Sequence, residues 1–173
     1  MSEDFVIPVH AQGFFAVCSD GTVHQVVTFD YYDPDQYYAE LEEEGRLEEE
    51  LEAMAARMQS FLDEEVVRIN GRRVRPTVEM VDLVYRGSRA RPSVTFAIMF
   101  GGRLVPGLNR YENEYEGEVV EYDYEVYWSL PPGARVVEVE LDGVVDVIDG
   151  RIVVARVARG ERVRGREVIV FEL

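Results

Sequence analysis

Hydrophobic and polar residues alternate along much of this chain with the period of two that is typical of β-strands. Residues 13–29 show this alternation on both sides of Asp20-Gly21, which predicts a hairpin that turns at these two residues. The dipeptide Asn70-Gly71 lies between two further alternating runs and predicts a second hairpin with a type I′ turn.

The rest of the chain after this second hairpin is also rich in strand-forming residues. The loop 86–92 is basic and separates two of the expected strands. The carboxyl-terminal part resembles a meander whose turns include Asp-Gly pairs. Strands are expected at 77–85 and 93–101 and within 134–173.

A helical pattern replaces the alternation between residues 34 and 62. Asp33 is a suitable N-cap and Pro34 suits the first helical position. Gly45 interrupts the pattern, so we expect a kink or a short first segment there. An apolar stripe with alternating spacings of four and three predicts the buried face, and it comprises Leu47, Leu51, Met54, Met58 and Phe61.

These elements predict one domain, residues 1–173, of the α+β class. The expected architecture is a mostly antiparallel β-sandwich or open barrel. One long acidic amphipathic helix is expected to pack on a sheet.

The stretch 109–128 contains seven carboxylates and five tyrosines. Up to Val119 the aromatic and acidic residues occupy opposite faces of a strand, and from Val120 the parity is reversed. A β-bulge or a strand that passes from one sheet to another would produce this reversal. Three interpretations follow: a solvated acidic face, a cleft that binds a sugar or a metal, and an acidic surface that docks on an Arg patch of another subunit.

The net charge of the chain argues against some classes of function. The net charge of −16 repels phosphates, so nucleic-acid binding is not expected. All 18 basic residues are Arg, a composition that fits a GC-rich genome and resembles that of thermophile proteins. No apolar run is long enough for a bilayer, and the first residues lack the features of a secretion signal. We therefore expect a cytoplasmic protein that is not inserted in a membrane.

The charges are also segregated along the chain. Residues 30–65 carry fourteen acidic side chains against two Arg, and residues 68–91 carry seven Arg against two acidic side chains. Blocks of opposite sign favour association through complementary charge. The sequence therefore predicts a homo-oligomer, here a homodimer.

The residues that usually ligate metals or act as nucleophiles are scarce. His10, Cys18 and His24 are the only His and Cys residues. A turn at Asp20-Gly21 would set Cys18 and His24 on opposite faces of the hairpin, which opposes a shared zinc site. The sequence predicts no metal and no cofactor, and it identifies no catalytic residue.

Aromatic, acidic and guanidinium side chains remain as candidates for ligand binding. The Arg residues of the basic loop could clamp an anion or could pair with acidic residues of the same molecule. The candidate ligand-binding residues are Tyr111, Glu114, Tyr122, Asp123, Arg86, Arg89 and Arg91. The first functional hypothesis is a non-enzymatic interaction or assembly domain that self-associates. The alternative is a small-ligand (sugar or anion) binding protein or hydrolase that uses the stretch 111–128.

Overall fold

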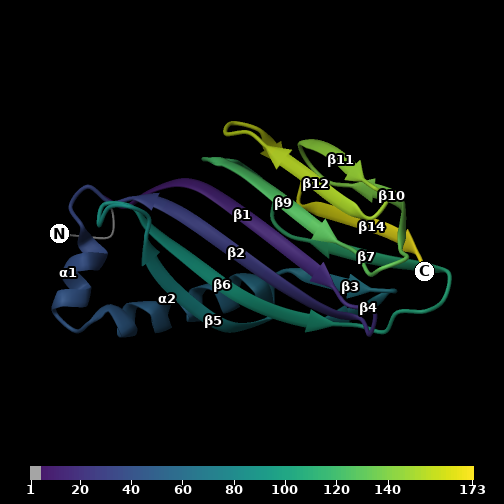
Figure 1. Ribbon diagram of the computed structural model, residues 1–173, viewed down its shortest axis with the longest axis horizontal. Coiled ribbons are helices and arrows are strands. Elements are labelled where there is room, and N and C mark those ends of the chain that lie inside the picture. The colour runs from purple at the N-terminus through teal and green to yellow at the C-terminus, as the bar shows by residue number, and fades with distance from the viewer. Residues whose placement is uncertain (1–4) are drawn as a thin grey trace.

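The computed structural model describes residues 5–173 and consists mostly of β-strands with two helices (Figure 1). This agrees with the predicted α+β class. None of the described helices combines the length and the apolar character needed to cross a membrane.

The larger sheet has seven strands in the order β11-β12-β9-β1-β2-β6-β5. Neighbouring strands are antiparallel except β1 and β9, which run parallel. The strands are β1 (Ile7–Val17), β2 (Thr22–Tyr32), β5 (Thr77–Tyr85), β6 (Pro92–Gly101), β9 (Asp123–Ser129), β11 (Val144–Ile148) and β12 (Ile152–Val157).

The second sheet has five antiparallel strands in the order β10-β14-β7-β3-β4. A small ribbon of β8 and β13 accompanies the two larger sheets. These strands are β3 (Val66–Ile69), β4 (Arg72–Val74), β7 (Leu108–Glu114), β8 (Glu118–Val119), β10 (Arg135–Glu140), β13 (Arg162–Val163) and β14 (Arg166–Glu172).

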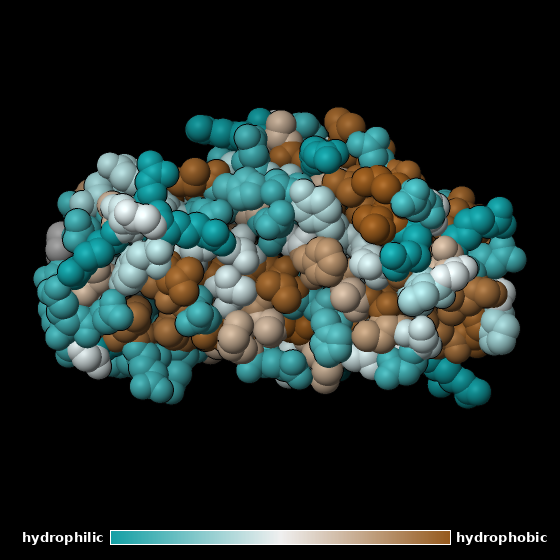
Figure 2. Space-filling model, in the orientation of Figure 1, coloured by the Kyte–Doolittle hydropathy of each residue, from teal (hydrophilic) through white to brown (hydrophobic). Residues whose placement is uncertain are grey.

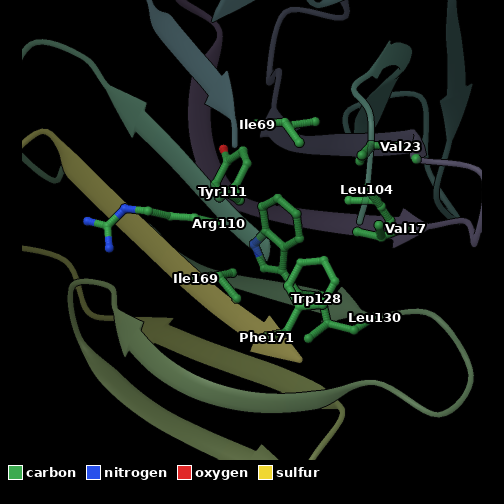
Figure 3. Close-up of a pocket in the computed structure, with 11 residues that line it drawn as sticks. Val17, Val23, Ile69, Leu104, Arg110, Tyr111, Trp128, Leu130, Ile169 and Phe171 are labelled. Atoms are coloured by element: carbon green, nitrogen blue, oxygen red, sulfur yellow. The ribbon is translucent and has the colours of Figure 1, made fainter. Parts of the chain in front are cut away.

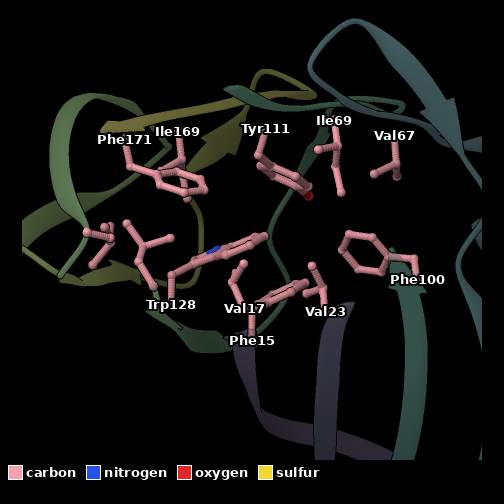
Figure 4. Close-up of a cluster of buried hydrophobic side chains, with 13 residues drawn as sticks. Phe15, Val17, Val23, Val67, Ile69, Phe100, Tyr111, Trp128, Ile169 and Phe171 are labelled. Atoms are coloured by element: carbon pink, nitrogen blue, oxygen red, sulfur yellow. The ribbon is translucent and has the colours of Figure 1, made fainter. Parts of the chain in front are cut away.

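The main core lies between the two larger sheets and centres on Trp128, which is 1% exposed. The indole stacks on Phe15 of its own sheet, with ring centroids 4.0 Å apart, and meets Tyr111 of the other sheet at 4.4 Å. Figure 4 shows the two facing sets of side chains, with Tyr111 and Ile169 on one side and Trp128 on the other. This contact holds the two sheets against each other and fixes the position of Phe15 and Tyr111, which also line the cavity between the sheets.

Two helices, α1 (Tyr37–Glu43) and α2 (Leu47–Glu64), replace the single long helix expected from the sequence. Gly45 lies between them with φ +69°, a left-handed conformation that favours glycine, so the predicted short first segment is confirmed. The N-cap residue of α1 is Gln36 and not Asp33, the residue expected from the sequence. The helix begins after Gln36, while a buried Asp33 accepts a bond from the Tyr38 amide at 3.3 Å.

Helix α2 packs against β5 and covers a second core cluster. Met54 is buried and Leu51 packs against the cluster, as the apolar stripe predicts. The prediction is wrong at Phe61, which is 65% exposed, because Leu62 takes the buried position in the last turn. A helix of 3.6 residues per turn lets either neighbour occupy this edge of the face, and the position of the sheet selects Leu62.

The Asn70-Gly71 hairpin is confirmed, since both residues have positive φ angles, as a type I′ turn requires. The expected meander at the carboxyl-terminal end is only partly present. Strands β11 and β12 form a hairpin, but β10 pairs with β14 in the other sheet. A local pattern of turns does not specify which sheet a strand joins.

The parity reversal in 109–128 marks a change of sheet. Strand β7 belongs to the five-stranded sheet and β9 to the seven-stranded sheet, with β8 between them. Tyr111 and Asn113 are buried on β7, and Trp128 is buried on β9. Both halves therefore direct their non-acidic face inward, as the alternation predicts.

Candidate functional site

A cavity of about 260 Å³ lies between the packed core of the two sheets and the carboxyl-terminal end of α2. Both large sheets, the β8 segment and the last turns of α2 contribute to its wall. The polar residues in the wall come from segments far apart in the chain and include Gln12, Gln25, Glu65, Asn113, Glu118 and Glu167.

The register of the five-stranded sheet explains why polar groups meet here. Ile69, Tyr111 and Ile169 form one row across β3, β7 and β14, and this row packs in the apolar core. Two residues further along the strands, Asn113 pairs in register with Val67 and Glu167. Side chains two residues apart share a face, so Asn113 and Glu167 also point between the sheets.

Glu167 is a half-buried carboxyl group at the wall of this cavity. The Tyr115 hydroxyl donates a hydrogen bond to Glu167 Oε1 at 3.4 Å. Burial, together with a smaller effect of the nearby Glu65 carboxyl group, raises the pKa of Glu167 from 4.5 to about 7. At neutral pH the group is therefore divided between its charged and neutral forms.

Glu65 is a second half-buried carboxyl group at the cavity wall and occupies the carboxyl-terminal cap position of α2. Burial raises its pKa, while Asn113 Nδ2, which donates to Glu65 Oε2 at 3.4 Å, acts in the opposite direction. Asn113 is 8% exposed, and its Oδ1 atom has no hydrogen-bond partner within the described part of the chain. One acceptor atom of a cavity-lining residue is therefore without a donor in the described structure.

The opposite wall belongs to the seven-stranded sheet and contains Gly13 in the middle of β1. Gly13 pairs with Val27 and Val126, which line the same cavity. A Cβ atom at Gly13 would lie 3.7 Å from Val126, an ordinary contact, so the backbone itself does not require glycine. The missing side chain leaves space between the sheets.

Two of the four predicted acidic and aromatic candidates line this cavity. Tyr111 and Tyr122 are in its wall, and burial raises the pKa of both hydroxyl groups. Glu114 and Asp123 point away from it. Glu114 lies 3.7 Å from the Arg68 guanidinium, and Asp123 accepts a bond from a backbone amide at 2.8 Å.

The three Arg candidates lie elsewhere, and two of them pair within the molecule. Arg86 Nε is 3.0 Å from Asp30 Oδ1, and Arg89 Nη2 is 2.6 Å from Glu43 Oε1. Arg91 lines an exposed hollow together with Arg86. The structure therefore does not bring the Arg loop and the tyrosines into one site.

Glu65, Glu167 and Gly13 were not recognised from the sequence. A signal for Glu167 exists in the alternation of the last strand, where its parity matches the buried Ile169 and Phe171. An acidic residue at an inward position is unusual and marks a candidate site. Glu65 offers no such signal, because it lies between a helix and a strand.

A second hollow beside Trp128 is too small for a ligand. Its volume is about 10 Å³, and Tyr111, Ile169 and Leu104 surround it (Figure 3). This is roughly the space of one water molecule, but the wall exposes no polar surface to hold one. Figure 3 also shows that the Arg110 side chain extends away from the indole ring.

The parity argument about Cys18 and His24 is wrong. Val17 pairs with Val23 and Ala16 with His24, because three residues, not two, form the turn between Cys18 and Thr22. By alternation Cys18 then shares a side with His24. Across residues 5–173, no three His, Cys, Asp or Glu side chains are grouped so that they could hold a metal ion.

Comparison with known proteins gives no family. No family model matches the chain, and no curated protein matches it. An aminopeptidase N family protein from Idiomarina loihiensis is similar over 92% of this chain and 29% of its own, with 9% identity and a TM-score of 0.41. A candidate protease from Parabacteroides distasonis ATCC 8503 is similar over 99% of this chain and 41% of its own, with 7% identity and a TM-score of 0.35. The chain spans less than half of either protein, and neither similarity carries an argument about function.

Proposed function

We propose that this chain is a small-molecule-binding protein, and that its two large sheets form a sandwich that holds the ligand in the cavity beside Glu167. The observation that carries the proposal is the pair of inward polar side chains, Asn113 and Glu167, at the wall of an open space, with Asn113 buried and its Oδ1 atom without a partner in the described structure. Protein cores are usually close-packed, and both a cavity and a buried carboxyl group reduce stability. Perturbed ionisable groups in a cavity are typical of functional sites.

A thermal-shift screen of small molecules tests this proposal, with Gly13→Val as the diagnostic variant. The valine side chain would extend into the cavity from a strand position that accepts a Cβ atom. We expect ligands that stabilise the wild type to lose their effect in Gly13→Val. His24→Val, at an exposed position of the same sheet, is the matched control and should retain the response.

A ligand that stabilises the wild type and Gly13→Val equally would contradict the proposed site, as would a broad screen without any stabilising compound. Chromogenic glycosides belong in the same screen. Turnover of a glycoside that disappears in Glu167→Gln would favour a hydrolase that uses Glu65 and Glu167 as its carboxyl pair.

Self-association is a second candidate function, favoured by the outer face of the seven-stranded sheet. A row of apolar side chains crosses this face in register, formed by Tyr127, Phe14, Val26, Ala97 and Met80. Phe14 is 46% exposed, Val26 41% and Met80 43%. Figure 2 shows tan and brown side chains in the middle of the molecule, where β1, β2 and β6 run in Figure 1.

Such a row favours a homodimer in which the apolar faces of two copies meet. The pairing of Arg86 and Arg89 inside one molecule leaves less of their charge for a partner. We therefore propose apolar contact, and not charge complementarity, as the basis of this dimer.

A further inference from the structure

The charged groups in the cavity wall all have the same sign. Glu65, Glu118 and Glu167 are acidic, and none of the described residues that line the cavity is basic. The local field therefore disfavours an anion and favours a cation. The basic loop 86–92, in contrast, would favour an anion.

The two half-buried carboxyl groups of the cavity wall, Glu65 and Glu167, retain hydrogen-bonding capacity. Tyr115 donates to Glu167, and Asn113 donates to Glu65, and both bonds have a length of 3.4 Å. This distance exceeds the usual upper limits of about 3.2 Å for N–H···O bonds and about 3.0 Å for O–H···O bonds, so the contacts are weak. A bound donor could approach either carboxyl group more closely than its present partner does.

Asn113 lies between these groups and supplies a third acceptor. Its Nδ2 atom faces Glu65, its residue pairs with Glu167 across the strands, and its Oδ1 atom lacks a partner in the described structure. A buried acceptor without a donor costs about 1–3 kcal/mol. A ligand group with several N–H donors would satisfy all three residues.

The remaining wall is apolar and aromatic. Phe15, Phe100 and Tyr111 line it on the side of the main core, and Tyr124 lines it near β8. Aromatic faces attract cations as well as hydrocarbon. A dry cavity of about 150 Å³ accommodates benzene, so about 260 Å³ is sufficient for one ring with a short polar chain.

We propose that the cavity binds a primary amine, with its ammonium group among Glu65, Asn113 and Glu167 and its apolar body against the aromatic wall. An ammonium group carries three donors and a positive charge, which matches three acceptors in an acidic site. This inference rests on the proposed ligand-binding function, because it specifies the chemical class of the ligand for the same cavity.

Two probes of nearly equal shape test the inference: 2-phenylethylamine and 2-phenylethanol. Titration calorimetry at pH 8 measures both affinities, and at this pH the amine is charged and Glu167 is mostly ionised. We expect the amine to bind at least tenfold more tightly than the alcohol. Glu167→Gln and Asn113→Leu should each reduce the amine affinity at least fivefold, and Glu167→Gln should reduce the amine affinity more than the alcohol affinity.

Glu114→Gln is the matched control, since Glu114 is on the same strand as Asn113 but faces outward, and it should change neither affinity. Circular dichroism verifies that each variant is folded. Asn113→Leu alters packing as well as hydrogen bonding, so Glu167→Gln is the variant that isolates the charge.

The outcomes separate this inference from the proposed function. Equal affinities for amine and alcohol, both lost in Gly13→Val, would overturn the amine inference and leave the cavity as a ligand site. An amine affinity unchanged in Glu167→Gln would also overturn it. Absence of binding by either probe would overturn the amine inference, whereas the proposed function is contradicted only by the screen described above.

Discussion

At the scale of single residues, Glu167 is the most informative side chain in the molecule. It occupies an inward strand position where the neighbouring inward residue, Ile169, is fully buried. A carboxyl group at this position loses hydration, and its hydrogen-bonding contacts with Tyr115 and Tyr111 do not offset that loss. The cost appears as a raised pKa, and it links the stability of the protein to pH.

The first prediction is that Glu167→Gln stabilises the protein at pH 8. Between the ordinary pKa of 4.5 and the folded value of about 7, the folded state holds a proton that the unfolded state releases. Stability from this group is therefore fully present below 4.5 and falls as the pH rises to about 7. The variant should gain up to about 3 kcal/mol at pH 8 and little at pH 4.

Urea unfolding of both proteins at pH 4, 6 and 8 measures this difference. Groups that interact with Glu167, including Glu65, Tyr115 and Asp142, are present in both proteins. A variant that is less stable than the wild type at pH 8 would mean that the ionised Glu167 has a stabilising partner in the folded state.

The second prediction concerns the pH dependence of amine binding. Protonation of Glu167 removes a negative charge from the site, so affinity for 2-phenylethylamine should rise between pH 6 and 8. In Glu167→Gln this rise should be much smaller. Calorimetry in buffers between pH 6 and 8 measures the affinity of both proteins for the amine. If the affinity of Glu167→Gln rises with pH as much as that of the wild type, a group other than Glu167 is responsible for the pH dependence.

At the scale of elements, α2 links the second core cluster with the cavity. Met54 packs on the cluster, and Met58 and Leu62 also line the cavity. The last turn ends at Glu64, which brings Glu65 to the cavity wall. The helix therefore positions Glu65, one of the two half-buried carboxyl groups at the cavity wall.

The third prediction compares two positions on this helix. Met54→Ala should destabilise the protein by about 2–5 kcal/mol because it opens a cavity in a packed cluster. Phe61→Ala should cost less than about 1 kcal/mol because Phe61 is 65% exposed. Denaturant unfolding measures both, with Glu49→Ala as a surface control. Equal losses would show that α2 presents a different face to the sheet.

At the scale of the whole molecule, acidic surface and one apolar sheet face coexist. The net charge of −16 opposes association of two copies by electrostatic repulsion, whereas the exposed apolar row that contains Phe14 and Val26 favours it. Exposed ion pairs such as Arg89 with Glu43 contribute little to stability. The balance between repulsion and apolar contact determines whether two copies associate.

The fourth prediction is a homodimer that the double substitution Phe14→Ser and Val26→Ser dissociates. Because apolar contact dominates, added salt should preserve or tighten this dimer by screening the net charge. Sedimentation at low and high salt measures the effect. Changing Arg86, Arg89 and Arg91 to Ala together is the matched comparison and should leave the dimer intact.

A dimer that loosens with salt and with the triple Arg change would indicate association through complementary charge instead. A monomer under all conditions at high protein concentration would contradict self-association altogether.

The sequence by itself determined the local features of this protein. Alternation indicated the strands and the inward faces of the stretch 109–128, and Asn70-Gly71 specified a type I′ turn. Gly45 predicted the division of the helical region. These features depend on neighbours in sequence, because side-chain parity and turn conformation arise within a few residues.

Only the tertiary structure decided which strands became neighbours and what lies between the sheets. The separation of β7 and β9 into two sheets follows from packing, as does the pairing of β10 with β14. The cavity brings together Gly13, Glu65 and Glu167, which belong to three distant segments. The raised pKa of Glu167 likewise depends on burial by groups remote in sequence. The physical reason is that the burial of a group and the electrostatic potential at it depend on all the atoms around it in space. Most of these atoms belong to residues distant in sequence, so a local sequence pattern does not specify them.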